Sequence, residues 1–244
     1  MSEPLRFLIV QHMSWEGPGV HLLRAADRLG VQFHGVEIWH TPMPDPSRFD
    51  GMVVLGGSPN VDQEVEYPFL KAEKAAIRRV IEAGKPFLGF CLGHQLLGHV
   101  LGARVGPNFR RSVGFTEGRL TAAGRRHPLF EGLPDSFPLF KWHGQAVLRP
   151  LPDHLEVLVT SPDCEMEAIS LKGKPYVVGL QFDNHAASPM DAAVWLEGDR
   201  DWLAQPPAVD PALVLRDAER LQELMGAQFE ICFENFISLC RSRA

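Results

Sequence analysis

A five-residue segment, Gly89-Phe90-Cys91-Leu92-Gly93, constrains the fold of this chain more than any other part of the sequence. It follows a short apolar run and precedes HQLLGHVLG, which has the apolar spacing of an amphipathic helix. Glycines on both sides of a central residue permit a sharp strand-to-helix turn that presents that residue above a sheet. Cys91 is therefore expected at a helix N-terminus, where the helix dipole favours the thiolate. The alternative role for Cys91 is that of a small, buried apolar residue.

Strand and helix patterns alternate through the first hundred residues. Short apolar runs rich in branched residues predict strands, and apolar residues spaced three and four apart predict helices. Such alternation is typical of a parallel sheet with helices on both faces, which binds ligands beyond the carboxyl ends of its strands. In chain order, the expected elements are strand 5–11, helix 17–30, strand 31–38, strand 51–55, helix 69–82 and strand 87–90.

Shorter apolar runs separated by turns follow Gly102, and the segment 208–240 is expected to be largely helical. A chain of 244 residues lies near the upper size of one domain. We therefore expect one α/β domain over residues 1–244, built on a doubly wound, mainly parallel sheet. The later strands expected in it are 118–120, 137–141, 155–160, 167–171 and 177–182.

Charge and cysteine usage narrow the class of function. A formal charge of −6 without a basic cluster argues against a nucleic-acid partner. No apolar run approaches the ~20 residues that span a bilayer, and the N-terminus lacks a signal-peptide pattern, so we expect a cytoplasmic protein without a membrane partner. The cysteines form no C-x-x-C pair, which predicts free thiols and neither a metal nor a cofactor. They are Cys91, Cys164, Cys232 and Cys240.

The string KPFLGFCLGHQLLGHVLGARV, residues 85–105, resembles the G-x-C-x-G-x-Q nucleophile motif of class I glutamine amidotransferases. The resemblance covers most of the chain and implies a flavodoxin-like fold with Cys91 as the nucleophile. It also implies an oxyanion hole formed by the backbone N–H groups of Gly57 and Leu92. Gln95 lies one helical turn beyond Cys91, and the resemblance assigns it to substrate binding.

Two further segments bear on the substrate side of the resemblance. KWHGQAV, residues 141–147, resembles the family's substrate-side loop, which makes His143, Gly144 and Gln145 candidates for substrate binding. In FRRSVGF, residues 109–115, Ser112 stands where relatives often carry a glutamate, so contacts to the substrate are expected to differ.

The chain departs from the family at its Q-F-H-P-E signature. Here the segment 181–185 reads QFDNH, so Asp183 occupies the histidine position and His185 the glutamate position. Aspartate is a weak base, and its charge disfavours a neighbouring thiolate, so the substitution predicts weak or absent glutaminase activity. Residues i and i+2 of an extended segment share one side, which makes His185 a candidate base oriented by Asp183. The alternative for His185 is a solvated histidine on a surface loop.

Two functions therefore compete. The favoured one is cysteine-dependent hydrolysis of glutamine or another small γ-glutamyl amide through a glutamyl thioester at Cys91, with a synthetase subunit as a candidate partner. The alternative is a binding or regulatory module that keeps the fold and pocket but has lost turnover, and the D-N-H segment supports it. The related branch of cysteine-elbow chaperones and peptidases is a third, less favoured alternative.

Overall fold

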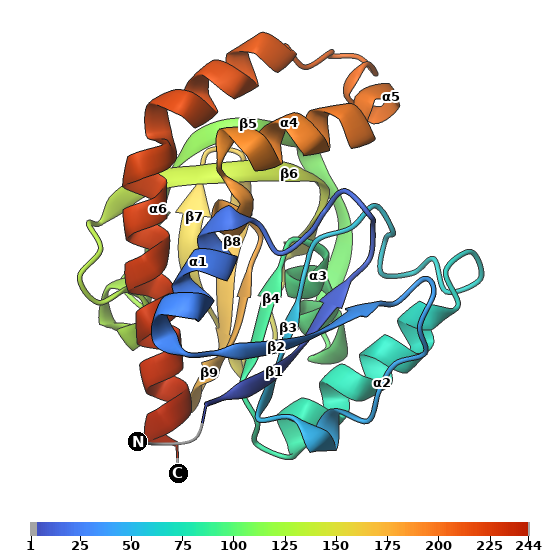
Figure 1. The fold of residues 1–244 in the computed structure, drawn as a ribbon, viewed down its shortest axis with the longest axis vertical. Coiled ribbons are helices and arrows are strands. Elements are labelled where there is room, and N and C mark those ends of the chain that lie inside the picture. The colour runs from blue at the N-terminus through green and yellow to red at the C-terminus, as the bar shows by residue number, and fades with distance from the viewer. Residues whose placement is uncertain (1–3, 244) are drawn as a thin grey trace.

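The computed structural model describes residues 4–243, and a nine-stranded sheet lies at its centre (Figure 1). The strands are β1 (Arg6–Gln11), β2 (Gln32–Glu37), β3 (Gly51–Val54), β4 (Phe87–Phe90), β5 (Arg104–Leu120), β6 (Ser136–Leu148), β7 (Leu155–Ser161), β8 (Cys164–Leu171) and β9 (Lys174–Leu180). Their order in the sheet is β2-β1-β3-β4-β9-β8-β7-β5-β6. The pairs from β2 to β9 are parallel, whereas the pairs from β9 to β6 are antiparallel.

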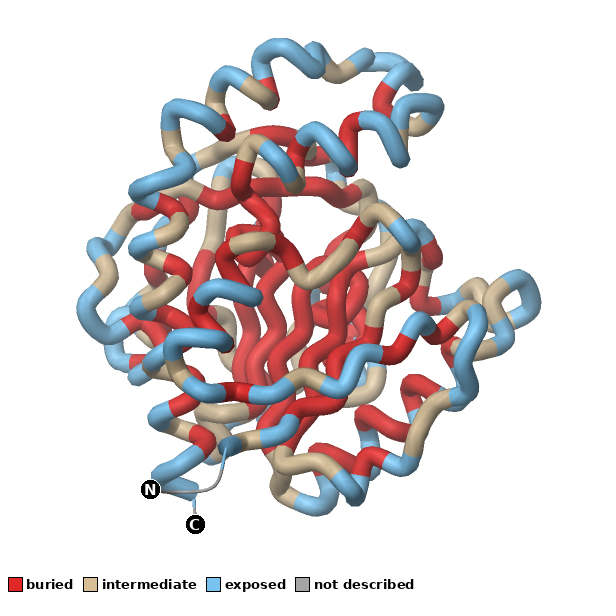
Figure 2. Tube along the Cα trace, in the orientation of Figure 1, coloured by how far each residue is buried: buried red, intermediate tan, exposed pale blue. Residues whose placement is uncertain are grey.

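Helices cover both faces of the parallel strands, which confirms the expected doubly wound α/β fold. Residues of α1 (Val20–Leu29) and α6 (Pro211–Ser242) pack in one apolar cluster, and residues of α2 (Phe69–Glu82) and α3 (Leu92–Val100) pack in another. Figure 2 shows the central strands as the most deeply buried part of the chain. Strands β3 and β4 are buried throughout, as expected for parallel strands covered on two sides.

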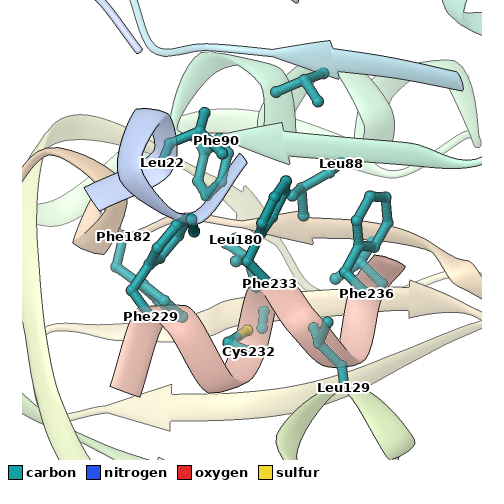
Figure 3. Close-up of a cluster of buried hydrophobic side chains, with 14 of the residues drawn as sticks. Leu22, Leu88, Phe90, Leu129, Leu180, Phe182, Phe229, Cys232, Phe233 and Phe236 are labelled. Atoms are coloured by element: carbon teal, nitrogen blue, oxygen red, sulfur yellow. The ribbon is translucent and has the colours of Figure 1, made fainter. Parts of the chain in front are cut away.

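Aromatic side chains dominate the cluster under α6 (Figure 3). Phe90, the last residue of β4, lies in this cluster, and its ring centroid is 6.2 Å from that of Phe229. Phe229 in turn stacks with Phe233. Burying one such side chain contributes roughly 1.5–3 kcal/mol relative to leaving it exposed. The contacts with α6 therefore hold the end of β4, which leads into the Cys91 turn.

The antiparallel part of the sheet departs from the expected boundaries. The runs predicted at 118–120 and 137–141 are parts of the much longer strands β5 and β6. The segment 141–147, expected to be a loop, lies inside β6, so that expectation is wrong. Glycine, proline and exposed polar residues hide the strand pattern of β5, and its register against β6 shifts between Pro107 and Ser112.

Two helices near the C-terminus, α4 (Pro189–Gly198) and α5 (Arg200–Leu203), were not predicted from the sequence. The Ser188 hydroxyl caps α4 by accepting a hydrogen bond from the Asp191 N–H at 3.1 Å. Within residues 4–243, no helix combines the length and the apolar character that crossing a membrane would require. Short 3-10 helices connect the other elements: η1 (Pro46–Arg48), η2 (Gly124–Arg126), η3 (Pro128–Phe130) and η4 (Asn184–Ala186).

Candidate active site

Cys91 forms a strained turn between β4 and α3. Its φ is 45° and its ψ is −102°, and it is the only non-glycine residue with a positive φ in the described part of the chain. The Cys91 N–H donates to the Leu180 carbonyl at 2.9 Å. A side chain at Gly89 would collide with the backbone of Gly93, so the two flanking glycines let α3 pack directly on β4. Such strain costs about 1–3 kcal/mol and is typical of functional sites.

A cavity of about 320 Å³ opens above this turn. It brings together most of the residues that the sequence nominated, from the turn, the glycine loop after β3, α3 and β6. Leu92, Asp183 and His185 are not among its lining residues. Those lining residues are Glu16, Gly57, Ser58, Pro59, Asn60, Cys91, Gln95, Trp142, His143, Gly144, Gln145, Asp199 and Trp202.

The glycine loop after β3 lies against the start of α3. A methyl group added to Gly57 would lie 2.6 Å from His12 Cβ and 3.2 Å from Leu92 Cδ2, so this close approach requires glycine. His12 Nδ1 is 2.8 Å from the Gly56 carbonyl oxygen, and its Nε2 is 2.9 Å from a carboxylate oxygen of Glu73. This buried pair supports the loop from behind.

Gln95 connects α3 to the strand that forms the far wall of the cavity. Its Nε2 donates to the Gln145 carbonyl at 3.1 Å and to Gln181 Oε1 at 3.2 Å. His143 Nδ1 is 2.8 Å from the same Gln145 carbonyl, and its Nε2 is buried without a partner in residues 4–243. Burial lowers the pKa of His143 well below its usual range, so its imidazole is neutral.

Two carboxylates lie close to Cys91. A methyl group added to Gly56 would lie 2.7 Å from Glu16 Oε2, 3.4 Å from Cys91 Cβ and 3.8 Å from Asp183 Oδ1, so three side chains converge there. Asp183 is completely buried, and neither of its carboxylate oxygens has a hydrogen-bond partner among the described residues.

Burial and negative charge together determine how these groups titrate. Burial raises the pKa of Cys91 well above its usual range, and Asp183 and Glu16 raise it further. Burial and the two carboxylates therefore outweigh the effect of the helix N-terminus, which was expected to lower the pKa of Cys91. Burial also raises the pKa of Asp183, and burial together with Asp199 raises that of Glu16.

His185 lies in the core and not on the surface, so the expectation of a solvated histidine is wrong. Its side chain is completely buried and stacks on Phe90, with ring centroids 4.1 Å apart. Asn184 anchors the segment, because its Oδ1 accepts from the Phe140 N–H at 2.8 Å and its Nδ2 donates to the Pro138 carbonyl at 3.0 Å. The structure thus brings Asp183 to Cys91 and leaves His185 in the aromatic cluster.

Comparison with known proteins decides the family. The family model for class I glutamine amidotransferases matches residues 20–185 of this chain. The chain belongs to that family. The chain is 32% identical over 182 residues to the glutamine amidotransferase-like protein YfeJ of Salmonella typhimurium, covering 72% of this chain and 74% of YfeJ. It is 31% identical over 163 residues to a subunit of the glutamine-hydrolyzing GMP synthase of Ignicoccus hospitalis, covering 66% of this chain and 80% of that protein.

A solved structure of a glutamine amidotransferase from Thermotoga maritima has the same fold. It superposes with a TM-score of 0.86 at 26% identity, covering 97% of this chain and 99% of that one. The three acidic and aromatic residues Glu16, Asp199 and Trp202 lie outside the segment that matches the class I amidotransferase family. They line the cavity nevertheless, and no sequence motif nominated Asp199 or Trp202. One feature of the sequence could have identified Glu16 as a site residue. It follows strand β1, whose carboxyl end borders the glycine loop.

A second group of polar residues adjoins the cavity of this family member and shares His143 with it. His143, Cys164 and Glu167 each offer a ligand atom, and these atoms lie within 4.8 Å of one another. The Lys141 ammonium forms a buried ion pair with Glu167 and thereby supplies the positive charge that a metal ion would bring. The cluster is therefore explained as an internal ion pair.

Proposed function

We propose that this class I glutamine amidotransferase hydrolyses glutamine or another γ-glutamyl amide through a thioester on Cys91. The observation that carries the proposal is the gathering of Cys91, the Gly57 loop and Gln95 around one cavity. The Cys91 sulfur would attack the γ-carbonyl carbon, and the N–H groups of Gly57 and Leu92 would stabilise the oxyanion. The amide C–N bond then breaks, and water cleaves the thioester to release glutamate.

Proton transfer in this reaction requires a group beside Cys91, and that group is a carboxyl in this chain. Asp183 and Glu16 are the titratable side chains that converge with Cys91 at Gly56. Burial raises the pKa of both carboxyls above the usual range, which makes each a stronger base than an exposed carboxylate. One carboxylate would accept the thiol proton and return it to the departing amine. Because the pKa of Cys91 is also raised, we expect slow turnover at neutral pH.

The position of His185 favours a second candidate function. With this imidazole stacked on Phe90, the histidine of the D-N-H segment does not line the cavity that contains Cys91. The alternative is a binding or regulatory module that holds a γ-glutamyl ligand without turning it over. Since one relative is named as a subunit of GMP synthase, a synthetase subunit is the partner class we propose for either function.

A covalent trap and a turnover assay separate the two functions. We would treat the protein with a diazoketone analogue of glutamine, measure the intact mass, and measure ammonia release from glutamine in parallel. Cys91→Ala should lose the adduct, whereas Cys164→Ala is the matched control and should keep it. An adduct with hydrolysis supports the hydrolase, and an adduct without hydrolysis supports the binding module. If no adduct forms on Cys91 and no ammonia is released from glutamine, the hydrolase is ruled out for this pocket.

A further inference from the structure

One wall of the cavity is acidic and aromatic. Glu16 comes from the loop between β1 and α1, Trp142 from β6, and Asp199 and Trp202 from the α4–α5 region. In Figure 1, α4 and α5 lie above the edge formed by β5 and β6. This wall faces the same cavity as Cys91, so a ligand acylating the thiol would extend toward it.

Specific contacts hold the wall in place. Trp142 Nε1 donates to Asp199 Oδ2 at 2.7 Å, which fixes the carboxylate at the rim. The guanidinium of Arg111 lies 5.2 Å from the centroid of the Trp202 ring and donates to the Trp202 carbonyl. Trp202 Cζ2 would lie 3.8 Å from a methyl group on Gly144. Both the carboxylate and the indole are therefore positioned before a ligand binds.

The charge of this wall is not balanced within the cavity. Glu16 and Asp199 line it, and neither lysine nor arginine appears among the lining residues of the described chain. Three cationic groups lie near the cavity without lining it, and each already has partners. His12 pairs with Glu73, and Lys141 pairs with Glu167. Arg111 donates to the carbonyls of Trp202, Gln205 and Pro207. Burial and the charges of Asp199 and Asp183 raise the pKa of Glu16, as expected for carboxyls that repel one another.

We propose that this acidic–aromatic wall binds a protonated amine on the leaving group of the substrate. The preferred substrate class is then a γ-glutamyl amide of a diamine or a similar cationic amine. This inference rests on the proposed function, because it assumes that the γ-glutamyl part occupies the Cys91 side of the cavity. Carboxylates attract the ammonium through charge-assisted hydrogen bonds, and the indole of Trp142, which lines the cavity, adds cation–π attraction. Hydrolysis adds one water across the amide bond and yields glutamate and the free diamine.

Binding to the Cys91→Ala variant tests the inference without turnover. Calorimetry would compare three matched γ-glutamyl amides, made with ethylenediamine (cationic), propylamine (neutral) and β-alanine (anionic). We expect the cationic amide to bind at least about tenfold more tightly than the neutral one, and the anionic one to bind most weakly. Glu16→Gln and Asp199→Asn, each added to Cys91→Ala, should reduce that preference. Asp201→Asn is the matched control, because Asp201 is an exposed carboxylate of α5 outside the cavity lining.

Proton release gives an independent readout. A bound cation should lower the raised pKa of Glu16, so titrations in buffers of different ionisation enthalpy should show protons released with the cationic amide and none with the neutral one. Equal affinity for the three amides would overturn the inference even if the wild type hydrolyses glutamine. Conversely, a cation preference that depends on Glu16 and Asp199 in a protein that hydrolyses no γ-glutamyl amide would leave the cation site standing and refute the proposed hydrolase.

Discussion

The imidazole of His185 stacks on the ring of Phe90 with an interplanar angle of 21°. Phe90 immediately precedes Cys91, so two neighbouring residues point into different environments: Phe90 into the cluster under α6, and Cys91 into the cavity. Through this stack, the histidine of the D-N-H segment becomes part of the aromatic core. Asp183 alone of that segment is left close to Cys91.

The first prediction concerns stability. His185→Ala should lower the free energy of unfolding by about 2–4 kcal/mol, because it removes a fully buried ring between Phe90 and Trp195. His185→Phe is the matched control and should be at least as stable as the wild type, since neither nitrogen of His185 has a hydrogen-bond partner in the described chain. Urea denaturation measures both. If His185→Phe folds normally but loses glutamine hydrolysis that the wild type shows, His185 is the base after all.

The second prediction concerns acid stability. Burial lowers the pKa of His185 from 6.5 to about 3, so the unfolded chain binds this proton more readily than the folded one. The contribution of His185 is complete above pH 6.5 and is lost progressively as the pH falls toward 3. We expect His185→Phe to flatten the fall of the unfolding free energy over this window, as measured by urea denaturation at a series of pH values. An unchanged slope would show that folding does not lower the pKa of His185.

The sequence predicted the parallel half of the fold better than the antiparallel half. In the parallel half, β1, β3 and β4 are short apolar runs, as at 51–55 and 87–90, so the pattern is local. Strands β5 and β6 depend on pairing with distant segments, and the exposed polar residues and glycines of β5 carry no such pattern.

The site shows the same division between local and distant information. The Cys91 turn could be predicted because its glycines encode it locally, whereas the position of His185 depends on contacts with Phe90 and on the anchoring of Asn184 to β6. Asp199 reaches the cavity only because α4 and α5 fold over the sheet edge, and no spacing rule links it to Cys91.

The third prediction concerns thiol reactivity. Cys91 lines the cavity, whereas Cys232 and Cys240 are buried in the core with pKa values of about 12, so iodoacetamide should modify Cys91 first. The rate should rise steeply with pH, because the pKa of Cys91 is raised. Glu16→Gln should shift this profile toward lower pH by removing a nearby negative charge. Peptide mapping identifies the modified residue, and preferential labelling of another cysteine would contradict the prediction.

The last prediction concerns the altered base. Asp183→His should increase glutamine hydrolysis, because it places an imidazole of matched pKa beside Cys91 and removes a negative charge that raises the pKa of the thiol. A positioned acid–base group increases the reaction rate about 10²–10⁴-fold. We expect the lower end of this range here, because the orienting glutamate of the family is absent. Glu16 could orient the new imidazole in place of that glutamate, since its carboxylate and the side chain at position 183 both lie close to Gly56. Asp183→Asn is the matched control: it removes the charge without adding a base, so it should speed alkylation of Cys91 but leave hydrolysis low. If Asp183→His hydrolyses glutamine no faster than Asp183→Asn while both fold as the wild type does, the missing imidazole is not what limits this site.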